Sequence, residues 1–233
     1  MMRVSPYLIS FARLRRGWMR AFPVVAVAGA LLGACAAPAG PATSRASDPL
    51  LPRLALGDSP RLGSPVATIA IVEFSDYQCF YCQGFHAREF PRLKQTYVDT
   101  GVVQYIHKDF PLVKLHTQAA PAAIAARCAG AQGRFWEMRH ELYVNTKLND
   151  GLYSSLAKTL GLDVRAFQTC LADVAPRQAI YRDVEEGVHL GVDSTPTFLL
   201  GTIEGDTIKI ARIAAGTPEF EVFAREIETL RKP

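Results

Sequence analysis

The sequence predicts an α/β domain with a mixed central sheet and a helical insertion. Three observations support this fold class. An apolar, β-branched stretch at 66–74 precedes a helical segment and a second strand-like stretch at 101–110. A long helical region follows at about 117–191, and the chain then returns to two strands and a helix. The expected order is therefore βαβ, an all-helical insertion, and ββα.

The N-terminal segment 1–34 has the composition of an export signal. It carries five arginines and no acidic residue, and it ends in an apolar run of 14 residues, Ala21 to Ala34. A membrane-spanning helix needs about 20 residues. We therefore expect a signal peptide, with an uncleaved anchor helix as the alternative. The letters LGAC, which end at Cys35, resemble the lipobox of bacterial lipoproteins, which implies lipidation of Cys35. Simple cleavage nearby is the alternative.

Residues 35–60 are expected to form a flexible tether, because proline, alanine, glycine and serine dominate and no amphipathic period is visible. The folded domain is expected at 61–233. Five of the 26 basic residues and none of the 22 acidic residues lie in 1–34, so the formal charge of +4 becomes −1 without that segment. A near-neutral domain without a basic stripe argues against nucleic-acid binding.

The first strand is expected at 66–74, where the sequence VATIAIVEF is typical of a strand buried on both faces. The next helix begins at the motif CFYC, whose cysteines are Cys79 and Cys82, and Pro91 interrupts it. A second strand at 101–110 completes a βαβ unit.

The insertion at 117–191 is rich in alanine and contains an apolar stripe at helical spacing, which is expected in the core: Phe135, Met138 and Leu142. The sequence then turns to β structure. Ile208 and Ile210 alternate with polar residues along the last strand, and residues 204–206 before it have the composition of a hairpin turn. A C-terminal helix follows.

Three pieces of sequence occur in a fixed order: EFSDYQCFYC at 73–82, the helical insertion, and STPTF at 194–198. Together they resemble the thioredoxin fold, and within it the DsbA-like thiol–disulfide oxidoreductases of the bacterial cell envelope. The resemblance covers about Gly63 to Leu230. It implies a βαβ–ββα thioredoxin fold with a helical insertion. It also implies disulfide exchange with protein substrates, without a cofactor, because the cysteine sulfurs carry the electrons.

Cys79 is the expected nucleophile, because backbone N–H groups and the helix dipole favour a thiolate at the first turn of a helix. Cys82, one turn further and more buried, is the expected resolving cysteine. A static local disulfide is one alternative. A metal site is another, because His86 lies on the same helical face as Cys82. No second CxxC and no HxxxH in the sequence completes a tetrahedral site, so His86 is interpreted as a surface or packing residue.

The resemblance implies a substrate-binding surface around Cys79. Pro196 is expected to form a cis peptide bond with Thr195 and to face Cys79, so that Thr195 presents its backbone to the substrate. An ordinary trans proline at the start of a strand is the alternative. Phe80 and Tyr81 are expected to line the same surface.

Glu73 lies in an otherwise apolar strand, six residues before Cys79. A buried carboxylate has a raised pKa, and the resemblance implies that Glu73 relays a proton to Cys82. Lys108 is the partner considered for it. The alternative is a glutamate at a strand end that reaches solvent.

The two cysteines of the insertion, Cys128 and Cys170, are expected to form a structural disulfide. The resemblance implies this bridge, since many DsbA-like proteins carry one across this insertion, and exported proteins fold in an oxidising compartment where spare thiols pair. The alternative is two buried free cysteines.

The predicted function is that of a thiol–disulfide oxidoreductase in the periplasm or on the outer face of the cell membrane, held there by a lipid anchor. It is expected to be a monomer that oxidises the dithiols of exported proteins and is itself oxidised by a membrane redox partner. An isomerase, a reductase, or a redox-inert peptide-binding module are the alternatives. Phe80 and Tyr81 place no positive charge between the cysteines, which predicts a milder oxidant than a Pro-His centre.

Overall fold

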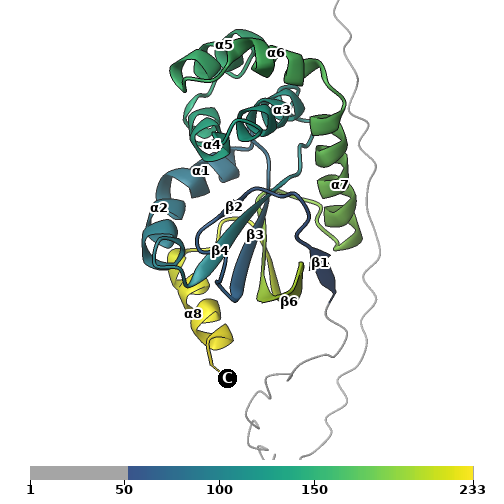
Figure 1. The fold of residues 1–233 in the computed structure, drawn as a ribbon. Coiled ribbons are helices and arrows are strands. Elements are labelled where there is room, and N and C mark those ends of the chain that lie inside the picture. Colours follow the sequence, from purple (N-terminus) through teal and green to yellow (C-terminus); the bar gives the residue numbers. More distant parts are fainter. Residues whose placement is uncertain (1–51, 233) are drawn as a thin grey trace, which may run out of the picture. The chain divides into compact units, whose positions relative to one another are not determined.

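The computed structural model describes residues 52–232. A six-stranded mixed sheet lies at the centre, in the order β1-β6-β5-β3-β4-β2 (Figure 1). The strands β3 and β4 are parallel, and all other neighbours are antiparallel. The strand bounds are β1 Arg53–Ala55, β2 Arg61–Leu62, β3 Ile69–Ser75, β4 Val103–Asp109, β5 Thr197–Glu204 and β6 Thr207–Ala215. The predicted α/β class is confirmed by this arrangement.

The predicted signal peptide at 1–34, the proposed lipidation of Cys35 and most of the predicted tether lie outside the described residues. Within residues 52–232, no helix is both long enough and apolar enough to cross a membrane.

Strand β1 corrects the predicted N-terminal boundary, because the sequence analysis assigned its residues to the tether. It pairs antiparallel with β6 at the edge of the sheet. Leu54 and Leu56 are 2% and 1% exposed, so this segment belongs to the core. A strand of three residues buries one side chain between two exposed ones, which is too short a pattern to be recognised as a period.

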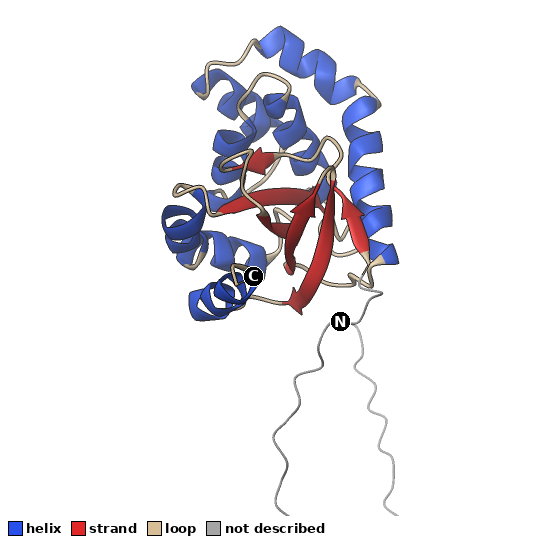
Figure 2. Cartoon of the chain, turned by 60° about the horizontal axis from the view of Figure 1, so that its bottom comes forward, coloured by secondary structure: helices blue, strands red, loops and turns tan. Residues whose placement is uncertain are grey.

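Helices cover both faces of the sheet (Figures 1 and 2). Apolar side chains of α1, α2 and α8 pack on one face, and α7 packs on the other. The helical segments are α1 Phe80–Arg88, α2 Phe90–Leu93, the π-helix η1 Lys94–Val98, α3 Ala119–Gly130, α4 Phe135–Val144, α5 Asp150–Thr159, α6 Val164–Ala172, α7 Ala175–His189 and α8 Phe220–Leu230.

The central strand β3 is buried along its whole length. Alternation divides its side chains between the two faces: Ile69 and Ile71 pack with α1, α2 and α8, whereas Val72 and Phe74 pack on the side of α7. The next residue on the face of α1 is Glu73. This alternation therefore directs the buried carboxylate towards the helix that carries the CFYC motif.

The helical insertion, α3 to α7, has a core of its own, to which the predicted stripe belongs: Phe135, Met138 and Leu142 are 6%, 0% and 0% exposed. Cys79 and Cys82 are part of the same apolar cluster. The insertion therefore forms one wall of the cysteine site.

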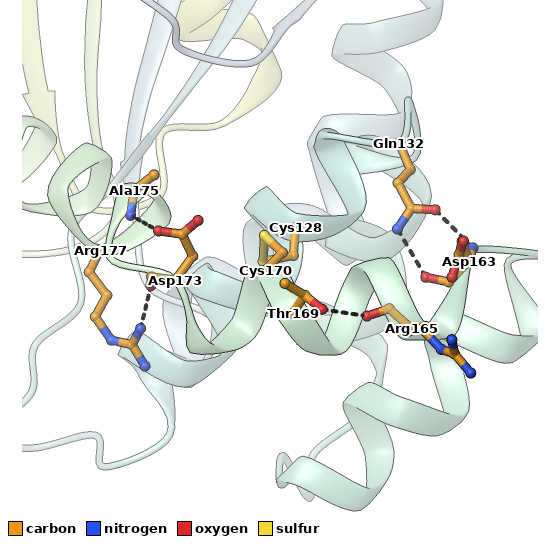
Figure 3. Close-up of a disulfide and its surroundings, with 9 residues drawn as sticks. All are labelled: Cys128, Gln132, Asp163, Arg165, Thr169, Cys170, Asp173, Ala175 and Arg177. Carbon is orange, nitrogen blue, oxygen red and sulfur yellow. Dashed lines mark hydrogen bonds between the residues drawn. A yellow bond between two sulfur atoms is a disulfide. The ribbon is translucent and has the colours of Figure 1, made fainter.

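A disulfide between Cys128 and Cys170 joins α3 to α6 (Figure 3). A polar link lies beside it: the backbone N–H of Asp163, at the start of α6, donates to the Gln132 side chain at 2.8 Å. The Gln132 amide donates in return to the Asp163 carbonyl oxygen at 3.2 Å. Helix α6 is thus held by one covalent link and one amide pair.

Replacing both Cys128 and Cys170 by alanine is expected to lower the free energy of unfolding by about 4 kcal/mol, because the unfolded chain regains the freedom that the bridge removes. The bridged residues are 42 positions apart. Urea unfolding of the two proteins measures the difference. Gln132→Ala is the control, since it removes only the amide pair and should cost about 1 kcal/mol. A loss no larger than that of the control would contradict the prediction.

Candidate active site

Cys79 caps the N-terminus of α1, directly after the loop that follows β3. Its backbone is extended, with φ −68° and ψ 120°, and α1 begins at Phe80. Asp76 holds the loop in place, because its carboxylate accepts from the backbone N–H groups of Gln78 at 2.7 Å and Leu112 at 2.8 Å. Cys79 therefore lies at the carboxyl end of β3, with the unpaired N–H groups of a helix start beside its sulfur.

The structure brings four of the predicted site residues together. Cys79 and Cys82 are free thiols, and their exposed fractions are 6% and 0%. The Cys79 thiol donates to the Thr195 carbonyl oxygen at 3.2 Å. The peptide bond between Thr195 and Pro196 is cis. The side-chain hydroxyl of Thr195 is buried without a hydrogen-bond partner in the described part of the chain, so it is available to the neighbouring sulfur.

The pKa of the Cys79 thiol is lowered to about 6. The hydrogen bond from the Cys82 thiol is the largest cause, and burial opposes it. Thr195 and the backbone N–H groups of Cys82 and Tyr81 lower the pKa further. Cys79 is therefore mainly a thiolate at neutral pH, which is the form that attacks disulfides.

The pKa of the Cys82 thiol is raised well above its ordinary value. Burial is the main cause, and the negative charges of Cys79 and Glu73 add to it, whereas a hydrogen bond from Ser75 opposes them. Cys82 therefore keeps its proton when Cys79 has lost its own. The two sulfurs of the motif are chemically distinct.

Phe80 and Tyr81 lie on the surface beside the two sulfurs, with exposed fractions of 74% and 62%. Their rings meet edge to face, with centroids 5.8 Å apart. An exposed aromatic pair of this kind offers apolar contact area to a partner chain.

Glu73 is completely buried and accepts three hydrogen bonds. The donors are Ser75 at 2.8 Å, Tyr105 at 2.5 Å and the guanidinium of Arg139 at 2.5 Å. The predicted raised pKa is wrong. Burial acts to raise the pKa of Glu73, but the charge of Arg139 and the hydroxyl donors outweigh it, so the pKa is lowered. The alternative of a solvent-exposed glutamate is wrong as well, because Glu73 is 0% exposed.

Lys108, the partner considered for Glu73, lies elsewhere. Its neighbour in the ladder is Phe74, whose side chain lies on the face of α7. The Lys108 ammonium accordingly contacts two carboxylates of α7, Asp183 at 3.1 Å and Glu186 at 2.6 Å. The prediction failed because a one-residue difference in position along a strand changes the face of the sheet.

Arg139 of α4 is the site residue that sequence analysis missed. It is only 1% exposed, and its carbon Cζ lies 4.8 Å from the Phe90 ring centroid and 4.9 Å from that of Tyr143. An arginine in a helix is usually exposed. A signal was nevertheless present, because Arg139 occupies the i+4 position of the apolar stripe that starts at Phe135 and thus faces the core.

His86 is buried and packs rather than joining Cys82 as a ligand. Its ring nitrogens lie 3.1 Å from the Arg139 guanidinium and 3.0 Å from the His140 ring. Burial and the charge of Arg139 lower the pKa of His86 to about 3, so the ring is neutral. Among residues 52–232, no group of three or more His, Cys, Asp or Glu side chains could hold a metal ion.

A family model described as thioredoxin matches residues 56–212, more than half of the chain. The chain belongs to the thioredoxin family. The predicted thioredoxin fold is confirmed by this match and by solved structures. The crystal structure of α-DsbA1 from Wolbachia pipientis is 26% identical with a TM-score of 0.65, covering 78% of this chain and 94% of that chain. BdbD from Bacillus subtilis, at 20% identity and a TM-score of 0.64, shares the fold over 75% and 94% of the two chains.

Curated relatives of this thioredoxin-family chain include two kinds of protein. A probable disulfide bond formation protein D of Bacillus cereus is 28% identical over 144 residues, which are 58% of this chain and 67% of that protein. The Na(+)/H(+) antiporter NhaA 3 of Salinispora tropica is 34% identical over 140 residues, 59% of this chain. The match spans only 21% of the antiporter, so it concerns a small part of that protein.

The rate of Cys79 alkylation in the reduced protein is expected to rise with pH and to reach half its maximum near pH 6. The reason is that only the thiolate reacts with iodoacetamide. Mass spectrometry of samples quenched at short times measures the rate at each pH. Cys79→Ser is the control, since Cys82, the other free thiol among residues 52–232, is buried and protonated and should stay unmodified in this range. A midpoint near the ordinary cysteine pKa of about 8.5 would contradict the assignment.

Replacing Arg139 by methionine is expected to lower the free energy of unfolding by about 3–5 kcal/mol, because the buried Glu73 carboxylate loses its counter-charge. Urea unfolding at neutral pH measures the loss. The double variant with Glu73→Gln and Arg139→Met should be more stable than Arg139→Met alone, since it contains no unpaired charge. If both proteins are equally unstable, Arg139 stabilises the fold through packing alone.

Proposed function

We propose that the chain is a thiol–disulfide oxidoreductase that oxidises dithiols of exported proteins outside the cytoplasm. The observation that carries this proposal is the pair of cysteines with unlike pKa values at the start of α1. Cys79 is mainly a thiolate, Cys82 retains its proton, and a cis-proline peptide lies against Cys79. The α-DsbA1 structure and the Bacillus disulfide bond formation protein D relative support the same chemistry.

The proposed cycle starts with the Cys79–Cys82 disulfide. A substrate thiolate attacks the sulfur of Cys79, which forms a mixed disulfide and breaks the bond to Cys82. Cys82 leaves as a thiolate and takes up a proton. The second substrate thiolate then attacks the substrate sulfur of the mixed disulfide, and Cys79 leaves. The substrate loses two electrons and the protein gains them.

The low pKa of Cys79 favours this direction. A thiol of low pKa is a good leaving group, and stabilising the thiolate stabilises the reduced protein, which makes its disulfide a stronger oxidant.

The contribution of the Cys79 thiolate to the stability of the reduced protein has a defined pH window. Cys79 titrates near pH 6 in the folded protein and near pH 8.5 when unfolded. The stability gained from its thiolate is therefore fully present above about pH 8.5 and is lost as the pH falls through 6.

The substrate-binding role of Phe80, Tyr81, Thr195 and Pro196 is part of the proposal. The exposed rings of Phe80 and Tyr81 supply apolar contact area next to the sulfurs. The carbonyl oxygen of Thr195 lies 3.2 Å from the Cys79 sulfur, so the backbone before the cis-proline borders the reacting atom. An extended substrate segment placed there would present its own sulfur to Cys79.

The compartment and partners are proposed on the same grounds. The disulfide between Cys128 and Cys170 is of a kind that persists in oxidising compartments, and the predicted signal at 1–34 and lipid attachment at Cys35 agree with export. A membrane redox partner would restore the Cys79–Cys82 disulfide. We propose that the protein acts as a monomer held at the membrane by the lipid.

A reductase or isomerase role is the second candidate, and the aromatic pair favours it. Phe80 and Tyr81 bring no positive charge to the thiolate, so the centre is expected to be a milder oxidant than one with a cationic residue between its cysteines. A peptide-binding module without redox chemistry is the remaining alternative. Thiol–disulfide exchange that is lost in Cys79→Ala would exclude it, because a redox-inert module shows no exchange to lose.

The test combines a redox potential with cysteine variants. Equilibration with glutathione buffers is expected to give a potential between about −270 mV, typical of a reductant, and about −120 mV, typical of a strong oxidant. Cys79→Ala should abolish oxidation of a reduced, unfolded protein substrate. Cys82→Ala should accumulate the mixed disulfide.

The variant lacking both Cys128 and Cys170 is the control and should retain exchange. Exchange that persists in Cys79→Ala would overturn the proposal. A potential at or below about −270 mV would overturn the oxidase direction and leave the reductase role.

A further inference from the structure

The outward face of α7 carries apolar side chains at regular intervals. Val174, Tyr181 and Val188 are 56%, 68% and 60% exposed, and they are seven positions apart in the sequence. Seven residues make almost two helical turns, so the three side chains form a stripe along the helix. Val174 directly precedes α7, and Val188 is its last residue but one. The stripe therefore runs the full length of a helix that lies at the edge of the domain (Figure 1).

An apolar hollow of about 240 Å³ lies beside the middle of this stripe. Tyr181 and Val184 of α7 line the hollow, together with Val113 of the loop before α3 and Ile124 of α3. An exposed aromatic side chain next to an apolar hollow is typical of a surface that binds a partner. The spacing of the stripe indicates the form of that partner, because a second helix presents its side chains at the same interval.

The charges on the same face are arranged symmetrically about Tyr181. Arg177 lies four residues before Tyr181 and Glu185 four residues after it, and both are exposed. Asp173 lies eight residues before Tyr181 and His189 eight residues after it, and both are exposed as well. Within residues 52–232, the Arg177 guanidinium contacts the backbone carbonyl oxygen of Asp173 at 2.5 Å and no carboxylate. Two such helices that pack antiparallel about Tyr181 place basic side chains opposite acidic ones.

We propose that α7 binds α7 of a second copy of this chain, antiparallel and around a two-fold axis at Tyr181. Val174 then packs against the partner's Val188, and the two Tyr181 side chains meet at the axis. Arg177 pairs with the partner's Glu185. Each of these contacts occurs twice, because the axis exchanges the two chains. The helix dipoles are opposed in this arrangement, which is their favourable orientation.

A lipid surface or an unrelated helix explains this face less well. Its exposed charges are of both signs, whereas an anionic bilayer selects clusters of basic residues. An unrelated helix could cover the apolar stripe, but it would not require matching residues at equal distances on either side of Tyr181. In a two-fold pair, one set of residues must serve both sides of the contact. The sequence of α7 meets that condition for its apolar and its charged positions.

The pairing leaves the redox chemistry within one chain. Each copy contains Cys79, Cys82 and the cis-proline, and none of these residues belongs to the stripe. A contact through one helix of 15 residues is a small interface, and interfaces below about 1,200 Å² are typical of weak, transient association. The single chain is therefore the unit that exchanges disulfides, and pairs form where copies are concentrated. The proposed lipid attachment at Cys35 would concentrate them, because it confines the copies to one surface.

Exchanging the charges tests the pairing and its register. Sedimentation equilibrium of the full chain in a density-matched detergent measures the dissociation constant. Arg177→Glu is expected to weaken self-association about tenfold, because like charges replace two exposed ion pairs, and Glu185→Arg should do the same. The variant with both substitutions should associate as tightly as the wild type, since unlike charges face each other again. A mixture of the two single variants should also form pairs, because each supplies the charge that the other lacks.

Two further variants test the apolar contact. Tyr181→Asp places two like charges at the axis and should abolish self-association. Val66→Asp is the matched control, because Val66 is 83% exposed and lies before β3 rather than on α7, and it should associate as the wild type does. The substituted side chains are all exposed, so the variants should fold and should exchange disulfides through Cys79 at the wild-type rate.

Three results would overturn the pairing. They are a wild type that stays monomeric up to about 1 mM, the weak limit of association, single charge variants that associate as tightly as the wild type, and a double variant as weak as the single ones. The inference does not depend on the proposed function. A wild type that pairs but exchanges no disulfide would contradict that function alone, because none of the pairing contacts involves a cysteine.

Discussion

The ion pair between Glu73 and Arg139 is the interaction on which the rest of the site depends. A carboxylate at the centre of a sheet loses its hydration, and its charge is tolerated only with a close counter-charge and satisfied oxygens. Arg139 supplies the charge at 2.5 Å, and Ser75 and Tyr105 supply the remaining donors. Because Arg139 belongs to α4, the charge state of a residue in the thioredoxin sheet depends on the packing of the helical insertion.

A second group of buried charges holds the insertion to the end of β4, and His107 links it to the first, because its ring lies 3.3 Å from Arg139 and 3.2 Å from Asp109. Arg127 of α3 contacts Asp109 at the end of β4 at 2.6 Å and also pairs with Asp183 of α7. Asp183 in turn contacts Lys108. Buried ion pairs add little net stability, but they are directional in a way that apolar contacts are not. These linked groups therefore orient α3, α4 and α7 relative to the strand ends that carry the cysteines.

The sequence predicted those features that depend on local patterns. The strands β3 to β6, the helix start at Cys79 and the apolar stripe of α4 all follow from sequence patterns over a few residues. The unpredicted features depend on partners distant in the sequence. Glu73 was expected to have a raised pKa because Arg139, 66 residues away, could not be placed beside it. Lys108 was assigned to the wrong face because the strand register is a tertiary property. Strand β1 was missed because three residues show no period and because it forms only by pairing with β6.

The unequal acidity of the two cysteines follows from the burial of Cys82, to which the charge on Glu73 adds. The motif has no cation between Cys79 and Cys82, so the largest stabilisation of the Cys79 thiolate is the hydrogen bond from the Cys82 thiol. That bond exists only while Cys82 keeps its proton. Burial and the negative charges of Glu73 and Cys79 ensure that it does, and Arg139 ensures that Glu73 stays charged. A neutral acid at position 73 would remove one of the charges that keep the proton on Cys82. The aromatic residues of the motif can therefore remain exposed for contact with substrate, because the acidity of Cys79 is controlled from beneath the helix, by the sheet and the insertion.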